Sequence, residues 1–358
     1  MSGKFNENTR VQVPAALHLC RLGYTYLDNI DEDDYDQSTN ILVKIFREAL
    51  ARLNPEMSGD EITQHITKVI QMAKNDDLGR EFYQQISQTS GIRFIDFENP
   101  DNNSWHCTTE FTCENPDTHY NFRPDITCFV NGLPLAFIEV KKPNNHEGIL
   151  AERERINTRF RNKAFRSFLN ITQLMIFSNN QEYETENLVP VQGAFYATVA
   201  KKKTFFNVFR EKDPNILRES GYTANISDDI QKQILKHRNC IPIKEDAEYK
   251  TNLSPNTPTN RIITFMLSRS RFLFILRYAF AYVERKQELA DGTKVETLEK
   301  HIMRYQRNTK TARSRLCLCG GSLLMIRCII SVRWTKRGNC QAEGRFCLLF
   351  SRICANLL

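Results

Sequence analysis

RPDITCFVNGLPLAFIEVKKP, residues 123–143, is the stretch of the sequence that decides the fold. Its runs 126–130 and 135–140 have the β-branched and aromatic content of strands. Between them lies Asn131-Gly132, the strongest short signal for a β-hairpin. The second run is apolar enough to be a central strand. This stretch therefore predicts two adjacent antiparallel strands within a covered sheet.

The charged residues of this stretch meet at one end of the predicted hairpin. Side chains alternate along a strand, so Glu139 and Lys141 share one face while Val140 points into the core. Strand pairing lays Asp125 beside Glu139. Two close carboxylates repel each other unless a cation lies between them, and Mg²⁺ or Mn²⁺ favours such oxygen ligands. We therefore predict a metal site at Asp125 and Glu139, with Lys141 placed to balance charge on a phosphate.

A purely structural explanation of these residues also exists. E-x-K triplets are common, and Lys141-Lys142-Pro143 fits a solvated strand end equally well. A functional role is nevertheless favoured, because Asp125 and the Glu139-Val140-Lys141 triplet lie on adjacent predicted strands. Charges at the tip of a buried strand also cost free energy unless they have a role.

The flanking sequence predicts an α/β (α+β) domain. Predicted helices span residues 13–22, 40–53, 58–73 and 147–168, and predicted strands span residues 92–97, 105–113, 126–130, 135–140, 174–177 and 193–199. Residues 252–260 are turn-rich, and residues 261–305 are predicted to be helical. This order of helices, strands, helix and strands is typical of a mixed central sheet flanked by helices.

The net charge of +7 is concentrated in the last 52 of the 358 residues. Residues 307–358 contain ten Lys/Arg and one acid, which leaves a balance of −2 for residues 1–306. The basic total therefore does not by itself indicate nucleic-acid binding. Six of the 11 cysteines also lie in this tail, without the spacing of a common zinc module. A zinc site or a disulfide framework would also explain these cysteines. Translation in a frame other than the natural one explains the tail best.

No apolar run is long enough to span a bilayer, and the N-terminus is polar, unlike a signal peptide. We therefore expect a cytoplasmic protein without membrane association. The five scattered cysteines before residue 307 are predicted to be free thiols.

Residues 123–143 resemble the nuclease motif of the restriction (R) subunit of type I restriction-modification enzymes. These subunits carry a PD-(D/E)xK endonuclease domain followed by an ATP-driven motor that translocates DNA. The resemblance covers approximately residues 8–306. It includes LCRLGYTYLD (19–28), ILVKIFREALARLNP (41–55), ITQLMIFSNNQEY (171–183), the segment 254–284 and HIMRYQ (301–306).

The resemblance implies a restriction-endonuclease-like fold and Mg²⁺-dependent (or Mn²⁺-dependent) hydrolysis of DNA. Asp125 and Glu139 would bind the metal, and Lys141 would complete the active site. Many relatives also have a Q-x-x-x-Y element in the next helix, whereas residues 155–160 here read RINTRF, with Phe160 in place of Tyr and no Gln. The expected partners are double-stranded DNA and the methyltransferase (M) and specificity (S) subunits.

Basic residues near the motif are candidates for contacts with DNA phosphates. They are Arg123, Lys142, Arg153, Arg155 and Arg159. An ordinary charged helix explains the three that lie in the predicted helix 147–168 equally well, because several glutamates accompany them.

The sequence contains no G-x-x-x-x-G-K-[ST] phosphate loop, although ATP is expected for the full-length family. We therefore predict a restriction-subunit fragment with four segments: helices at 1–90, the nuclease core at 91–250, a linker and the start of the motor region at 251–306, and the out-of-frame tail at 307–358. The alternatives are a non-cleaving DNA-binding or assembly module, an inactive gene remnant and an independent repair nuclease.

Overall fold

The computed structural model describes residues 6–88, 90–114, 121–143, 148–184, 191–200, 204–213, 215–288 and 294–304. The chain divides into two units, residues 1–311 and 312–358, and every described residue belongs to the first. The predicted out-of-frame tail lies outside the described residues.

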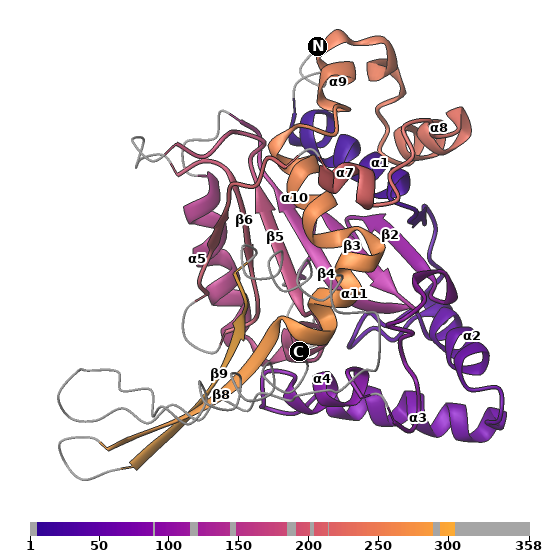
Figure 1. Cartoon of the computed structure of the whole chain (residues 1–358), viewed down its shortest axis with the longest axis vertical. Coiled ribbons are helices and arrows are strands. Elements are labelled where there is room, and N and C mark those ends of the chain that lie inside the picture. The colour runs from indigo at the N-terminus through magenta and orange to yellow at the C-terminus, as the bar shows by residue number, and fades with distance from the viewer. Residues whose placement is uncertain are drawn as a thin grey trace, which may run out of the picture. The chain divides into compact units, whose positions relative to one another are not determined.

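A seven-stranded mixed sheet forms the centre of this unit, with its strands in sequence order from β1 to β7 (Figure 1). The strands are β1 (Thr25–Tyr26), β2 (Trp105–Thr109), β3 (Ile126–Val130), β4 (Leu133–Val140), β5 (Leu174–Ser178), β6 (Ala194–Ala197) and β7 (Asn207–Phe209). The pairs β1–β2 and β4–β5 are parallel and the other four are antiparallel. With helices on both faces, this architecture confirms the predicted α/β fold.

The predicted hairpin is present and is formed by β3 and β4, whose register pairs Ile126 with Ile138. Asn131 and Gly132 both have positive φ, 52° and 79°, as a type I′ turn requires. Glycine is also needed for space, because a Cβ at position 132 would lie 2.6 Å from the carbonyl oxygen of Leu42. The turn therefore packs closely against Leu42 and Phe46.

Each face of the sheet packs against its own helices because side chains alternate along the strands. Residues on one face of the central strands, such as Ile138 and Ile176, join the main core with α1 (Val13–Arg21), α10 (Pro258–Leu267) and α11 (Arg269–Tyr278). Residues on the other face, such as Phe137 and Phe177, join a second core, in which Phe137 stacks on Phe168 and packs edge-on against Phe177. This second core is covered by α5 (Gly148–Arg161), η4 (Lys163–Phe165) and α6 (Arg166–Ile171).

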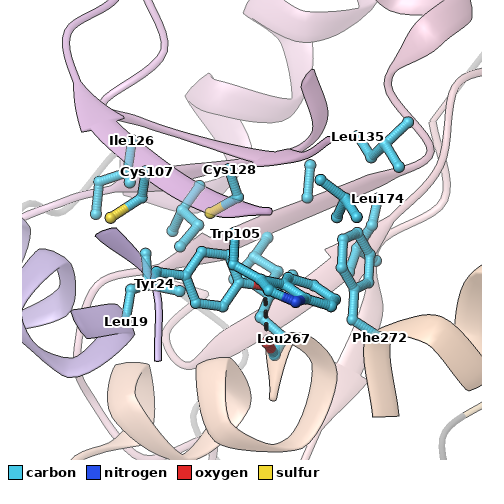
Figure 2. Packing of buried hydrophobic residues seen from close by; sticks show 14 of the residues in the cluster. Leu19, Tyr24, Trp105, Cys107, Ile126, Cys128, Leu135, Leu174, Leu267 and Phe272 are labelled. Carbon is cyan, nitrogen blue, oxygen red and sulfur yellow. Dashed lines mark hydrogen bonds between the residues drawn. The ribbon is translucent and has the colours of Figure 1, made fainter. Parts of the chain in front are cut away.

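Figure 2 shows part of the main core. The rings of Tyr24 and Trp105 meet edge to face with centroids 5.4 Å apart, below Cys107 and Cys128. The Tyr24 hydroxyl donates a 2.8 Å hydrogen bond to the carbonyl of Leu267, so the end of α10 is fixed to the sheet. The segment predicted as a linker and the start of a motor thus contributes helices to this core.

The N-terminal helices agree with the prediction. Helices α2 (Val43–Leu53), α3 (Gly59–Met72) and α4 (Arg80–Ile86) follow α1, which ends just before Gly23. A capping box of Ser58 and Glu61 begins α3, at the predicted start of this helix. The remaining elements are η1 (Asn8–Gln12), η2 (Glu32–Asp34), η3 (Pro100–Asn102), α7 (Asn215–Glu219), α8 (Asp228–His237), η5 (Ile241–Glu245) and α9 (Ala247–Asn252).

Two predicted elements are wrong. Residues 92–97 form no strand, because side-chain amides of Asn54 and Asn131 bind the backbone of Arg93 and Phe94 in place of a neighbouring strand. Residues 280–302 are not helical but form a hairpin of β8 (Phe280–Glu288) and β9 (Lys294–Ile302).

Two further predictions differ from the structure in their boundaries. The helix predicted at 147–168 is interrupted at Asn162, whose side chain caps the next turn. The strand predicted at 105–113 ends at Thr109, because Glu110 adopts a φ of +54°. The five cysteines in the described part are free thiols, as predicted. No helix in the described part is long and apolar enough to span a membrane.

Candidate active site

The structure brings Asp125, Glu139 and Lys141 together at one end of β3 and β4. Asp125 directly precedes β3 and accepts a 2.7 Å hydrogen bond at Oδ2 from the backbone N–H of Val140. Lys141 Nζ lies 3.9 Å from the same Oδ2. The hairpin register is the cause, since it places the residue before Ile126 opposite the residue after Ile138.

Glu139 is the most deeply buried of the three, with a side chain only 5% exposed. It lies on the face of the sheet covered by α5, and its Oε1 has no hydrogen-bond partner. The closest cation is Arg159, with Nη1 at 3.5 Å. Burial, and then the negative charges of Asp125 and Glu152, raise the pKa of Glu139 well above its ordinary value.

The pKa of Asp125 is also raised above its ordinary value. Burial raises its pKa, although Lys141 and the Val140 N–H oppose the shift. The neighbouring charge of Asp125 in turn raises the pKa of Glu139. Without a metal, the pair therefore retains a proton at a pH where free carboxyls have lost theirs.

Lys141 is almost enclosed, with 12% of its side chain exposed. Nζ donates a 2.9 Å hydrogen bond to the Val140 carbonyl and lies 3.5 Å from Glu7 and 3.6 Å from Glu152. Burial alone would lower the pKa of Lys141, but the surrounding carboxylates outweigh it and raise the pKa. The ammonium group therefore stays charged.

Sequence reasoning missed Glu152, which is 2% exposed and contacts Lys141, Arg155 and Arg159 within 3.3–3.6 Å. Its spacing from buried Ile149 and Ile156 places it on the inner stripe of α5, and this periodicity was a usable signal.

Two N-terminal residues, Glu7 and Gln12, were also missed. Glu7 contacts Lys141, and burial raises the pKa of its carboxyl. Gln12 Nε2 donates a 2.8 Å hydrogen bond to the backbone carbonyl of Asp125. No local pattern marks these residues, because their partners lie more than 110 positions away in the sequence.

The candidate DNA contacts fall into two groups. Lys142 is exposed, and the side chains of Arg123 and Arg155 are 60% and 61% exposed, so all three can reach a ligand. Arg153 and Arg159 are less accessible, since Arg153 lies beside Glu154 and Arg159 faces the site carboxylates and the ring of Phe122.

The donor set fits a hard divalent cation with an incomplete protein shell. In the described ranges, no group of three or more His, Cys, Asp or Glu side chains converges as a closed metal cage. Mg²⁺ does not require one, because it is commonly held by one or two carboxylates together with water and substrate phosphates. The buried Oε1 of Glu139, which lies beside Asp125 and has no hydrogen-bond partner, is the atom that a cation would satisfy.

Comparison with known proteins identifies the family that this chain resembles. Residues 4–185, half of the chain, match the family described as Type I restriction enzyme R protein N terminus. The chain is also similar to a Methanocaldococcus jannaschii protein provisionally named as the endonuclease subunit of the type I restriction enzyme MjaIXP. The two are 27% identical over 168 residues, which cover 41% of this chain and 16% of that protein. The matched family region contains Asp125, Glu139, Lys141 and all five candidate DNA contacts.

Proposed function

Because the chain belongs to the family of the type I restriction enzyme R protein N terminus, we propose that its buried carboxylate pair supports Mg²⁺-dependent or Mn²⁺-dependent hydrolysis of double-stranded DNA. The observation that carries this proposal is the Oε1 of Glu139, a buried acceptor that has no hydrogen-bond partner and lies beside a second carboxylate. Leaving such a group unsatisfied costs about 1–3 kcal/mol, and more when it is charged. A role in binding a cation explains why the group is there.

Each residue of the site has a distinct part in the proposal. Asp125 and Glu139 would hold the ion, with Asp125 kept in place through the Val140 N–H. A bound divalent cation supplies Lewis-acid stabilisation of charge on the phosphate. Lys141 remains protonated, so it stabilises negative charge on the phosphate and does not act as the base.

The exposed cations Arg123, Lys142 and Arg155 give the site its proposed contacts with the DNA backbone. From the family and the sequence we also propose methyltransferase and specificity subunits as partners and a cytoplasmic location. Recognition of a DNA sequence is not assigned to these residues, since phosphate contacts position a protein without reading bases.

A second candidate is a DNA-binding module that does not cleave. It is favoured by Arg159, whose Nη1 lies 3.5 Å from Glu139 Oε1 and 3.4 Å from Glu152 Oε1. A guanidinium in this place balances the carboxylates and competes with a metal for Glu139. In this alternative the acids would have a structural role only.

Plasmid nicking by the full chain tests the proposal. Supercoiled DNA is incubated with the chain and Mg²⁺ or Mn²⁺, and the Asp125→Ala and Lys141→Ala variants are compared with the parent. Glu245 and Lys250 provide matched controls, since they form an exposed carboxylate–ammonium pair 2.7 Å apart on the surface. Their alanine variants should nick DNA as the parent does.

We expect metal-dependent nicking that falls by more than about a hundredfold in both site variants, a larger loss than removal of an outer-shell group causes. Binding of DNA and Mn²⁺ without any nicking would support the non-cleaving module. Nicking that persists in Asp125→Ala would assign the activity to another site or to a contaminant.

A further inference from the structure

Residues at the end of α8 lie next to the proposed active site, although they are outside the matched region of 4–185. His237, the last residue of α8, hydrogen-bonds Tyr26 of β1 with Nδ1 2.6 Å from the hydroxyl. The same hydroxyl lies 2.6 Å from Thr109 Oγ1 at the end of β2. This end of α8 is therefore held against the sheet, beside the strand end that precedes Glu110.

The next residue, Arg238, has a side chain only 13% exposed and binds two separate segments. Its Nε donates to Asn8 Oδ1 at 3.2 Å, and its backbone carbonyl accepts from Asn8 Nδ2 at 3.4 Å. Its Nη2 donates to the carboxylate of Glu110. One guanidinium thus joins the N-terminal segment to the end of β2.

Both of these segments touch the proposed catalytic residues. Glu110 N–H donates a 3.1 Å hydrogen bond to the Asp125 carbonyl, and the Glu110 carboxylate lies 3.5 Å from Arg123, two residues before Asp125. On the other side, Asn8 directly follows Glu7, whose carboxylate lies 3.5 Å from Lys141 Nζ. Arg238 therefore has a short path to Asp125 through Glu110 and another to Lys141 through Asn8.

The backbone at Glu110 indicates that this arrangement has to be held in place. Its φ of +54° is unusual for a residue with a side chain and costs on the order of 1 kcal/mol or more. Such a conformation persists when the surrounding contacts determine it, and here those contacts are the Asp125 carbonyl and the two arginines.

We infer that Arg238 is a positioning residue of the nuclease site, which holds Glu110 and Asn8 so that Asp125 and Lys141 are aligned for the metal and the phosphate. The inference rests on the proposed function and adds a required residue from beyond the matched family region. Lysine cannot replace arginine here, because a single ammonium lacks the planar fork that reaches both partners.

The test compares Arg238→Lys, which keeps the charge, with Arg261→Lys in the full chain. Arg261 is a matched control because its side chain is 18% exposed and it forms a similar ion pair, with Glu182 at 2.7 and 2.9 Å, without contacting the site. Mn²⁺ affinity is measured by electron paramagnetic resonance. Amide hydrogen exchange of residues 6–12 and 105–111 is measured without metal.

We expect Arg238→Lys to weaken Mn²⁺ binding about tenfold, as the loss of outer-shell partners typically does. It should also speed exchange in both segments. Arg261→Lys should change neither quantity. Adding Glu110→Gln to Arg238→Lys should weaken Mn²⁺ binding by less than the product of the two separate effects, because both act on the same contact.

Mn²⁺ affinity and exchange in Arg238→Lys that equal those of Arg261→Lys would overturn the inference. The result is distinguishable from failure of the proposed function. A parent chain that binds Mn²⁺ without nicking DNA refutes cleavage, while the affinity of Arg238→Lys still decides the positioning role. If the parent does not bind Mn²⁺, the exchange measurement decides it.

Discussion

Glu139 should make the stability of the metal-free chain depend on pH, and Glu139→Gln tests this directly. The carboxyl is 5% exposed, its Oε1 has no hydrogen-bond partner, and Asp125 and Glu152 surround it with negative charge. Ionisation in this place is opposed by burial and by both neighbours, so the pKa is raised well above the ordinary 4.5. Glu139→Gln replaces the carboxyl with a neutral amide of the same shape, so it removes the ionisation and keeps the side-chain volume.

The sign and the size of the effect follow from proton linkage. Because the folded pKa is above the unfolded one, the folded chain binds more protons in the interval between them. The stabilisation is fully present below about pH 4.5 and is lost as the pH rises towards the folded pKa. Within that interval one proton changes the free energy of unfolding by about 1.4 kcal/mol per pH unit.

The assay is urea unfolding of parent and variant at several pH values between 5 and 8 in the presence of a chelator. The slope of stability against pH should be less negative in Glu139→Gln by about 1.4 kcal/mol per unit. The variant should also be more stable than the parent at pH 8. Glu245→Gln, a change at a side chain that is 80% exposed, should leave the slope unchanged. Asp125 contributes with the same sign, so the difference between parent and variant is the informative quantity.

Equal slopes in the parent and in Glu139→Gln would refute the reasoning, because they would mean that the buried carboxyl releases its proton as readily in the folded chain as in the unfolded one. Mn²⁺ provides a second check. It should stabilise the parent at pH 8 by replacing the proton, and it should stabilise the variant much less.

Four further outcomes are expected. Mn²⁺ affinity measured by calorimetry should rise about tenfold per pH unit below the folded pKa of the carboxylate pair, since binding displaces one proton. Gly132→Ala should lower the free energy of unfolding in urea by about 2 kcal/mol or more, because a Cβ there meets the backbone at 2.6 Å. Gly91→Ala is the control and should cost less, because Gly91 has a similar positive φ but nothing within 4 Å of its added Cβ. Burial lowers the pKa of Lys300 to about 7, so stability should rise between pH 7 and about 10 by about 1.4 kcal/mol per unit, and this rise should vanish in Lys300→Met. Arg155→Gln should lower the salt dependence of duplex binding, measured by fluorescence anisotropy, by about one ion.

The parts of the fold that were predictable are those set by neighbours in the sequence. Asn131-Gly132 determines a turn whose two residues need positive φ, and this turn forms the hairpin. A one-residue register shift between Cys128 and Phe129 then brings Asp125 opposite Glu139. The Ser58–Glu61 box likewise begins a helix from local contacts. A site built by one hairpin is therefore accessible to sequence reasoning.

The parts that were not predictable depend on distant partners. Residues 92–97 have strand-like composition, but Asn54 and Asn131 supply their hydrogen bonds from 39 and 37 positions away. The β8–β9 hairpin was read as helix because its apolar residues alternate only near its base, where Phe280 and Tyr282 pack against Lys300. Arg238 reaches Asn8 across 230 positions, and no local pattern encodes such a contact.

The charge balance of the site explains why those distant residues matter. Among the described groups, Asp125, Glu139 and Lys141 form ion pairs with one another and with the carboxylates of Glu7 and Glu152 and the cation of Arg159. When all are ionised, four negative and two positive charges leave two negative charges uncompensated, which is the charge that one divalent cation neutralises. Burial is the main reason why the pKa values of Glu7, Asp125 and Glu139 are all raised, and the neighbouring negative charges add to it. The motif alone supplies only two of the four acids, so the metal preference proposed here is a property of the assembled fold.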